Sequence, residues 1–287
     1  VGVLFVCIIV VARLVRGGGW SVKSGHVRLK VYAAAGVALA VYLGGEAVDD
    51  RYSKEAATVR AAVLRQNGMY GEAIDEFTLA IAKAESNSRE EAKLLMDRGA
   101  CRLKAGWPPG AKKDFEIAAR ADPGSAEAVY LQAMVLKQHM GNRQEAAALF
   151  RELLESNDEL PAYMRLEAYM TLGQAALEEG NLESALDYFE SASAAAPGKA
   201  APLLSAGNVY LGLFNDSGEK EYLEFAEKKF EKAAELEPGN ISALETLVMI
   251  YLAGGKRKGA RKIARRLLDL DPGNAVAERL LADSKRN

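Results

Sequence analysis

Apolar residues recur at helical spacing along most of this chain. From about Ser53 onward they return every three to four positions, and almost no stretch shows the alternation typical of strands. Glycine and proline interrupt the pattern at regular intervals. These breaks are Asp122–Gly124, Pro197–Gly198, Pro238–Asn240 and Asp271–Asn274. The pattern predicts an all-α fold of short helices that are separated by tight breaks.

The spacing of the breaks points to an internal repeat. Pro238 and Pro272 are separated by about 34 residues, a period that holds two helices per unit in known repeat proteins. The step from Pro197 to Pro238 is somewhat longer, and the step from Pro123 to Pro197 spans about two periods. Glycines in the apolar segments keep the same register, because Gly99 and Gly173 lie about two periods apart and Gly207 follows one period later. The chain is therefore predicted to repeat a unit of two helices.

Small and aromatic residues also recur in a fixed order. One unit has Tyr169, Leu172, Gly173 and Ala176 on a first helix, followed by Gly180, Ala185, Phe189, Ala192 and Pro197. The order alanine, phenylalanine, alanine returns at 73–80, 111–118 and 226–233. It changes to Ala146, Phe150, Leu153 in one unit and to Ala260, Ala264, Leu267 in the last. This combination resembles the tetratricopeptide repeat (TPR) family, which implies an α-solenoid of stacked helix pairs.

The repeats divide the chain into two regions. Residues 53–287 are predicted to form the solenoid, with repeats at 54–91, 92–125, 126–165, 166–199, 200–240 and 241–274 and a capping helix at 275–287. Two units are longer than the period between Pro238 and Pro272. Extra residues are expected to lengthen the turn at 215–223 inside the fifth unit and the junction at 156–161 after the third.

Residues 1–50 have a different composition and are predicted to form a membrane anchor. Apolar segments occupy 1–12 and 27–46, and the link between them, 13–30, carries only basic charges. Segment 27–46 has the roughly 20 residues that a spanning helix needs, and its flanking cations can reach the headgroups. One or two spanning helices are therefore expected, with a buried helical hairpin as the alternative. The positive-inside rule keeps the basic link in the cytoplasm and places the repeats outside, in the periplasm of a bacterium.

Catalytic constellations are missing from the sequence. It has two cysteines, Cys7 and Cys101, two histidines, His26 and His139, and no phosphate-binding, dinucleotide, zinc-protease or nucleophile-elbow motif. We therefore predict no enzymatic activity, no cofactor and no metal site. A net charge of −2 gives no reason to expect a nucleic-acid partner.

Two surfaces are candidates for partner binding. In TPR proteins the first helix of each pair lines a concave groove, so the resemblance implies a groove floor made of apolar and amide side chains. The predicted groove residues are Tyr130, Leu131, Met134, Met170, Gln174, Leu177, Leu204, Asn208, Leu211, Met249 and Leu252. The predicted basic patch consists of Lys256, Arg257, Lys258, Arg261, Lys262, Arg265 and Arg266. This patch suits anionic lipid, an acidic partner or the acidic middle of another copy (141–195), and a solvated helix face explains it equally well.

Together these features predict a non-enzymatic scaffold in the bacterial inner membrane that holds other proteins in its groove. The alternative is a maturation chaperone or an accessory subunit of a membrane enzyme complex. Two apolar segments before periplasmic repeats are similar in topology to a component of cytochrome c maturation systems. The basic link is shorter than in that family, so this resemblance covers topology only.

Overall fold

Thirteen helices and no strand make up residues 50–157 and 159–283, the part of the chain that the computed structural model describes. Twelve of the helices form six antiparallel pairs. The pairs are α3 (Asp50–Gln66) with α4 (Tyr70–Ala82), α5 (Arg89–Lys104) with α6 (Pro108–Ala121), α7 (Ala126–His139) with α8 (Arg143–Ser156), α9 (Ala162–Glu178) with α10 (Leu182–Ala195), α11 (Ala201–Ser217) with α12 (Lys220–Leu236), and α13 (Ile241–Ala253) with α14 (Arg257–Leu270). Helix α15 (Ala275–Asp283) follows the last pair.

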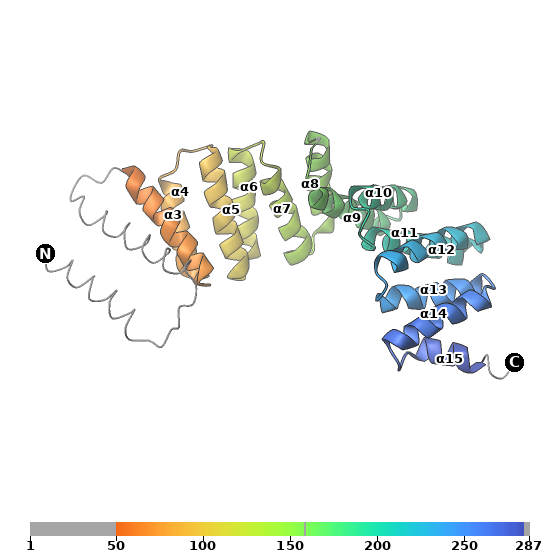
Figure 1. The fold of residues 1–287 in the computed structure, drawn as a ribbon. Coiled ribbons are helices and arrows are strands. Elements are labelled where there is room, and N and C mark those ends of the chain that lie inside the picture. Colours follow the sequence, from red (N-terminus) through yellow and green to blue (C-terminus); the bar gives the residue numbers. More distant parts are fainter. Residues whose placement is uncertain (1–49, 158, 284–287) are drawn as a thin grey trace, which may run out of the picture.

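The pairs stack one after another into an arched rod (Figure 1), and each helix packs chiefly on its neighbours in sequence. The pair α3–α4 forms one end and α14–α15 forms the other. The prediction of an all-helical stack of helix pairs is thus confirmed. The predicted membrane segments 1–12 and 27–46 lie outside the described residues. Within those residues, every helix is too short or too polar to cross a bilayer.

Glycine makes the turn inside every pair possible. Each of the six turns contains one glycine with φ between 65° and 79°. Residues with a side chain rarely adopt this left-handed backbone conformation, so glycine reverses the chain at the lowest cost in free energy. Side-chain caps add to the breaks before α5, α7, α13 and α15. The side chains of Ser88, Ser125, Asn240 and Asn274 accept hydrogen bonds from backbone N–H groups in the next helix.

The small and aromatic residues hold each pair together. The Phe189 ring lies on Gly173 so closely that a Cβ at position 173 would be 2.5 Å from its Cε1 atom. Gly99 faces Phe115 and Gly207 faces Phe230 in the same way, at 2.6 Å in both cases. Glycine thus leaves room for the aromatic ring of the partner helix, and the two backbones approach closely. This contact joins the two helices of one pair.

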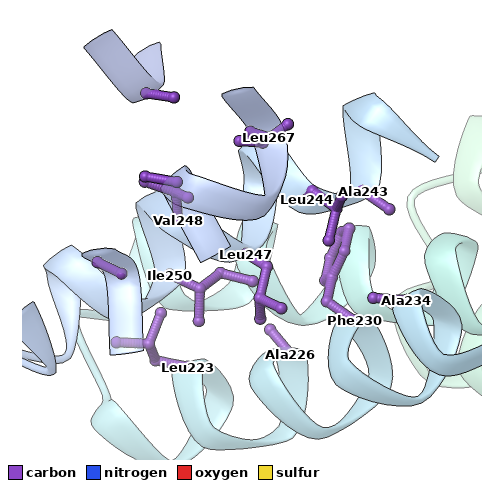
Figure 2. Close-up of a cluster of buried hydrophobic side chains, with 13 residues drawn as sticks. Leu223, Ala226, Phe230, Ala234, Ala243, Leu244, Leu247, Val248, Ile250 and Leu267 are labelled. Atoms are coloured by element: carbon purple, nitrogen blue, oxygen red, sulfur yellow. The ribbon is translucent and has the colours of Figure 1, made fainter. Parts of the chain in front are cut away.

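Neighbouring pairs share hydrophobic clusters. Figure 2 shows the largest one, in which Phe230 and Leu223 of α12 meet Leu244, Leu247 and Ile250 of α13. Ala264 takes the aromatic position on α14, and Leu267 fills the remaining space. All of these side chains are at most 5% exposed. Because such clusters span neighbouring pairs, the stack depends on contacts between neighbours, as in other solenoids.

Three predicted boundaries need correction. Helix α3 begins at Asp50, before the predicted start of the first repeat at 54. Helix α9 begins at Ala162 rather than after 165, because Pro161 ends the preceding link. The expected long turn at 215–223 is wrong: α11 extends to Ser217 and α12 starts at Lys220, so the extra residues lengthen both helices.

Candidate partner-binding surface

Large exposed apolar side chains gather on the first helices of the pairs. Val59 and Val63 of α3, Tyr163 and Leu177 of α9, and Ile241, Met249 and Leu252 of α13 are each 36% to 57% exposed. The second helices expose only Leu79, Leu236 and Leu270 among residues of this kind in the described part of the chain. We call the side of the stack formed by α3, α5, α7, α9, α11, α13 and α15 the first-helix surface. Its apolar residues make it the better candidate for protein binding.

The structure divides the predicted groove residues into two groups. Leu177, Asn208, Met249 and Leu252 are exposed. The other seven are half-buried, and most of them pack inside the stack: Tyr130, Leu131, Met134, Met170, Gln174, Leu204 and Leu211. The Tyr130 ring, for example, contacts Phe150 of its own pair at 5.9 Å and Tyr163 of the next pair at 5.7 Å. The surface open to a partner is therefore narrower than the sequence suggested.

Ion pairs close the first-helix surface in the N-terminal half. Lys54 of α3 pairs with Glu90 of α5 at 2.7 Å, and Arg65 pairs with Asp97 between the same helices. Lys137 of α7 pairs with Glu167 of α9 at 2.5 Å. These pairs are partly exposed, so each contributes little to stability. They place charge beside the exposed valines of α3 and along α5 and α7, and we take α9, α11, α13 and α15 as the apolar candidate region.

A shallow cleft lies at the C-terminal end of this region. It has a volume of about 310 Å³ and is lined by Leu252 of α13 and by Ala275, Val276, Arg279 and Leu280 of α15. Only Leu252 was predicted as a groove residue. The others belong to α15, which we expected to be a polar cap. Exposed Val276 could have signalled this cleft, because it continues the apolar spacing of α13 into α15.

A second cleft, of about 660 Å³, lies between the second helices α10 and α12 and was missed by sequence reasoning. Part of its lining is apolar or aromatic, including Leu203 and Tyr210 of α11 and Phe225 of α12, and the Tyr210 and Phe225 rings are 5.2 Å apart. Three lysines of α12 line it: Lys228, Lys229 and Lys232. Lys229 pairs with Glu190, and the Lys228 ammonium lies 5.7 Å from the Phe225 ring centroid. Such a cleft suits an acidic side chain next to an apolar one.

The predicted basic patch covers one side of α14, with Lys256 at its N-cap. Two of its residues are engaged within the stack. Lys256 pairs with Glu227 at 2.6 Å, and this hydrogen bond raises the pKa of Lys256. Arg266 donates to the backbone oxygens of Ala234 and Pro238 at 3.3 and 2.7 Å. The side chains of the other five have no hydrogen-bond or ion-pair partner in the described part of the chain: Arg257, Lys258, Arg261, Lys262 and Arg265.

A buried charge cluster in the second pair has a structural role. The Asp114 carboxylate is fully buried and accepts hydrogen bonds from Arg98 at 2.7 and 3.1 Å and from Arg102 at 2.5 Å. The Arg102 guanidinium also lies 4.7 Å from the centroid of the Trp107 ring. Burial lowers the pKa of Arg102, and Asp114 opposes that shift. Arg102 also donates to the backbone oxygen of Gly110 at 3.1 Å, so this cluster joins the two helices next to the α5–α6 turn.

Other chemistry-bearing residues do not form a site. Cys101 is buried, and burial raises the pKa of its thiol, which makes it a poor nucleophile. His139 is exposed at the end of α7. Residues 50–157 and 159–283 contain no group of three or more His, Cys, Asp or Glu side chains placed to hold a metal ion.

Comparison with known families agrees with this geometry. Two family models, both described as tetratricopeptide repeat, match residues 136–200 and 224–283. The chain contains tetratricopeptide repeats. The matched segments cover α8 to α10 and α12 to α15, where the pairs and their turns follow the TPR pattern. No curated protein matches the sequence.

Several solved TPR structures share the fold. Pseudomonas aeruginosa PilF is 17% identical, with 82% of this chain and 99% of PilF covered and a TM-score of 0.57. MamA from Desulfovibrio magneticus is 23% identical over 64% of this chain and 97% of its own, with a TM-score of 0.52. YrrB, described as a TPR protein with an unusual peptide-binding site, is 19% identical over 71% of this chain and 96% of its own, with a TM-score of 0.53. At these identities the likeness concerns the fold alone.

Proposed function

We propose that this TPR chain is a non-enzymatic scaffold that binds partner proteins on the first-helix surface of α9, α11, α13 and α15. The observation that carries this proposal is the exposure of Tyr163, Leu177, Met249 and Leu252 on one side of the stack. Side chains of this size stabilise a complex when a partner covers them, because burial removes their apolar area from water. The cleft at Leu252 and Val276 gives an inserted partner side chain a place to fit.

A matched set of variants tests this surface in full-length protein. We test the chain that carries Leu177→Glu, Met249→Glu and Leu252→Glu. The amount of specific partner protein that co-purifies with it is expected to fall at least tenfold. The control chain carries Leu236→Glu on the second helix α12, away from both ends of the stack, where the leucine is 36% exposed. Both variants replace exposed side chains, so we expect both proteins to fold. Equal loss from the two variants, or retention by the first, would contradict the proposal.

We further propose that residues 27–46 anchor the scaffold in the bacterial inner membrane, with the repeats in the periplasm. This proposal is supported by the sequence alone: a stretch of about 20 mainly apolar residues follows a link whose charges are all basic. An anchor of this kind raises the effective concentration of partners that are confined to the same membrane.

Fusion reporters test this orientation. Alkaline phosphatase fused after Asp50 is expected to be active, because the enzyme acquires its disulfides only outside the cytoplasm. Green fluorescent protein fused at the same point with the same export route is expected to be dark. Replacing Arg13, Arg16, Lys23, Arg28 and Lys30 with glutamine should reduce the phosphatase signal, since it removes the charge bias. An inactive phosphatase fusion that is made at normal levels would refute the proposed orientation.

A further inference from the structure

Two junctions between consecutive second helices carry an ion pair, with the cation on the earlier helix in one and on the later helix in the other. Lys112 of α6 pairs with Glu145 of α8 at 2.5 Å, and Glu190 of α10 pairs with Lys229 of α12. We count positions from the phenylalanine of each second helix. In the earlier helix of a junction, Lys112 lies three positions before Phe115, and Glu190 lies one position after Phe189. In the later helix, Glu145 lies five positions before Phe150, and Lys229 lies one position before Phe230. Each of these two sets is spaced by four positions, which places its members on one side of a helix.

Helix α14, the second helix of the last pair, carries cations at the positions that Lys112 and Glu190 hold in α6 and α10. Ala264 takes the aromatic position of α14, so the corresponding residues are Arg261 and Arg265. Arg257 and Lys258 add two more cations one turn earlier. None of the four has an ion-pair partner in the described part of the chain, and the Arg261 Nε atom is buried without a hydrogen-bond acceptor. At the α6–α8 junction, the cation at the position of Arg261, Lys112, pairs with an acid of the next second helix, Glu145.

Helix α4, the second helix of the first pair, carries acids at the positions that Glu145 and Lys229 hold in α8 and α12. Counting from Phe77 of α4, these residues are Glu72 and Glu76, with Asp75 beside them. Helix α4 contains no lysine or arginine. Glu76 pairs with Arg60 of its own pair at 2.8 Å, whereas Glu72 and Asp75 are exposed and have no ion-pair partner among the described residues. The two ends of the stack therefore have opposite charges at the positions that bridge helices inside it.

The acidic end also exposes a surface that is covered in every later repeat. In each later pair, the residue two positions after the helix crossing on the first helix is at most 5% exposed. These residues are Cys101 of α5, Val135 of α7, Ala175 of α9, Val209 of α11 and Ile250 of α13. The preceding second helix covers them. The corresponding residue of α3 is Val63, which is 46% exposed, and Val59 and Leu79 nearby are 47% and 43% exposed. This end has the surface of a stack interior without its neighbour.

We infer that copies of this chain associate head to tail, with the α14–α15 end of one copy on the α3–α4 end of the next. A contact of Arg261 with Glu72 would repeat the Lys112–Glu145 pair. A contact of Arg265 with Glu76 would join the positions of the Glu190–Lys229 pair with the charges exchanged, and the exposed valines would be covered. One copy cannot satisfy both ends by itself, because they lie at opposite extremes of the rod (Figure 1). A contact between different ends is heterologous, so it builds chains or rings rather than closed dimers. This inference uses α4 rather than the acidic middle of the chain, and it is independent of partner binding on the first-helix surface.

Charge reversal tests the inference on the full-length chain in a non-ionic detergent, with mass measured by analytical ultracentrifugation. Unmodified protein is expected to form concentration-dependent oligomers at about 50 mM salt that weaken at least tenfold at about 500 mM. A variant with Arg257→Glu, Arg261→Glu and Arg265→Glu should be monomeric, and so should one with Glu72→Lys and Asp75→Lys. Mixing these two variants should restore association, because each reversed end meets a complementary one. Lys228→Glu with Lys232→Glu, on the α10–α12 cleft, is the matched control and should associate normally.

Three outcomes would overturn head-to-tail association. A chain that stays monomeric at low salt at all accessible concentrations has no such contact. Oligomers that survive the α14 reversal must form elsewhere. Two monomeric variants that fail to associate on mixing show that the α14 and α4 surfaces do not meet. If the unmodified chain is monomeric yet binds vesicles of anionic phospholipid through α14, the basic helix serves a membrane surface instead.

Discussion

Replacing Asp114 with alanine is expected to destabilise the chain by about 3–5 kcal/mol. The carboxylate is fully buried between Arg98 and Arg102, whose side chains are only 12% and 14% exposed. Its removal leaves two desolvated guanidinium groups that repel each other and have lost their acceptor. Urea unfolding of the full-length chain, followed by far-ultraviolet circular dichroism, measures the change.

A control on the neighbouring helix of the same pair separates burial from charge. Asp97 of α5 also pairs with an arginine, Arg65, but the Asp97 and Arg65 side chains are 30% and 37% exposed. Asp97→Ala is therefore expected to cost at most about 1 kcal/mol. Asp114→Asn should fall between the two, because an amide oxygen still accepts hydrogen bonds while the charge is lost. If Asp114→Ala and Asp97→Ala have equal effects, the buried cluster does not stabilise the α5–α6 pair as described.

The second large effect is expected at the glycine–aromatic contact of the fourth pair. Phe189→Ala should destabilise the chain by about 3–5 kcal/mol, because it empties a fully packed site. Gly173→Ala should cost about 1–3 kcal/mol, because its new Cβ would meet the Phe189 ring at 2.5 Å. In the Phe189→Ala background the same Gly173→Ala change should become stabilising by about 0.5–1 kcal/mol, since alanine favours a helix once the ring is gone. Urea unfolding of the four proteins gives this double-mutant cycle.

Gly212 provides the matched control for this cycle. It also lies inside a helix, α11, but nothing is within 4 Å of the place where its Cβ would be. Gly212→Ala should therefore be stabilising by about 0.5–1 kcal/mol in the unmodified chain. A destabilising effect at Gly173 in both backgrounds would mean that helix crossing does not depend on the ring filling the glycine site.

Sequence reasoning predicted the helix pairs because their signals are local and repeated. Glycine and proline breaks, and the alanine–phenylalanine–alanine order, each depend on a few residues at fixed spacing. The Gly173–Phe189 contact follows from the same spacing, although its direction inside the pair required coordinates. The long turn expected at 215–223 was wrong because one glycine, Gly218 at φ 74°, reverses the chain within a short turn and leaves the rest helical.

The candidate surfaces were harder to predict because they depend on which face of each helix stays uncovered. Met249 and Gln174 have equivalent positions in their repeats, yet Met249 is 56% exposed and Gln174 is half-buried. The α10–α12 cleft depends on the separation of two helices that are not neighbours in sequence. The cluster of Asp114 with Arg98 and Arg102 could have been suspected, because the two arginines are spaced to share one helix face. The burial of this cluster could not be predicted from the sequence.

Head-to-tail association and partner binding would act together. A chain of copies would repeat the apolar region of α9, α11, α13 and α15 along its length, so a partner with several binding segments would be held by more than one copy. Multivalency of this kind increases overall affinity without new contacts. The variants above separate the two properties, because one set changes α9 and α13 and the other changes α4 and α14.

Site-specific photo-cross-linking in intact cells tests the central claim most directly. A photoreactive amino acid is placed at Met249 on the first-helix surface or at Leu236 on a second helix, in otherwise unmodified full-length protein. The account predicts discrete cross-linked partner proteins from position 249 and none from position 236. The same partners captured equally from both positions, or only from position 236, would show that the first-helix surface is not where this scaffold binds.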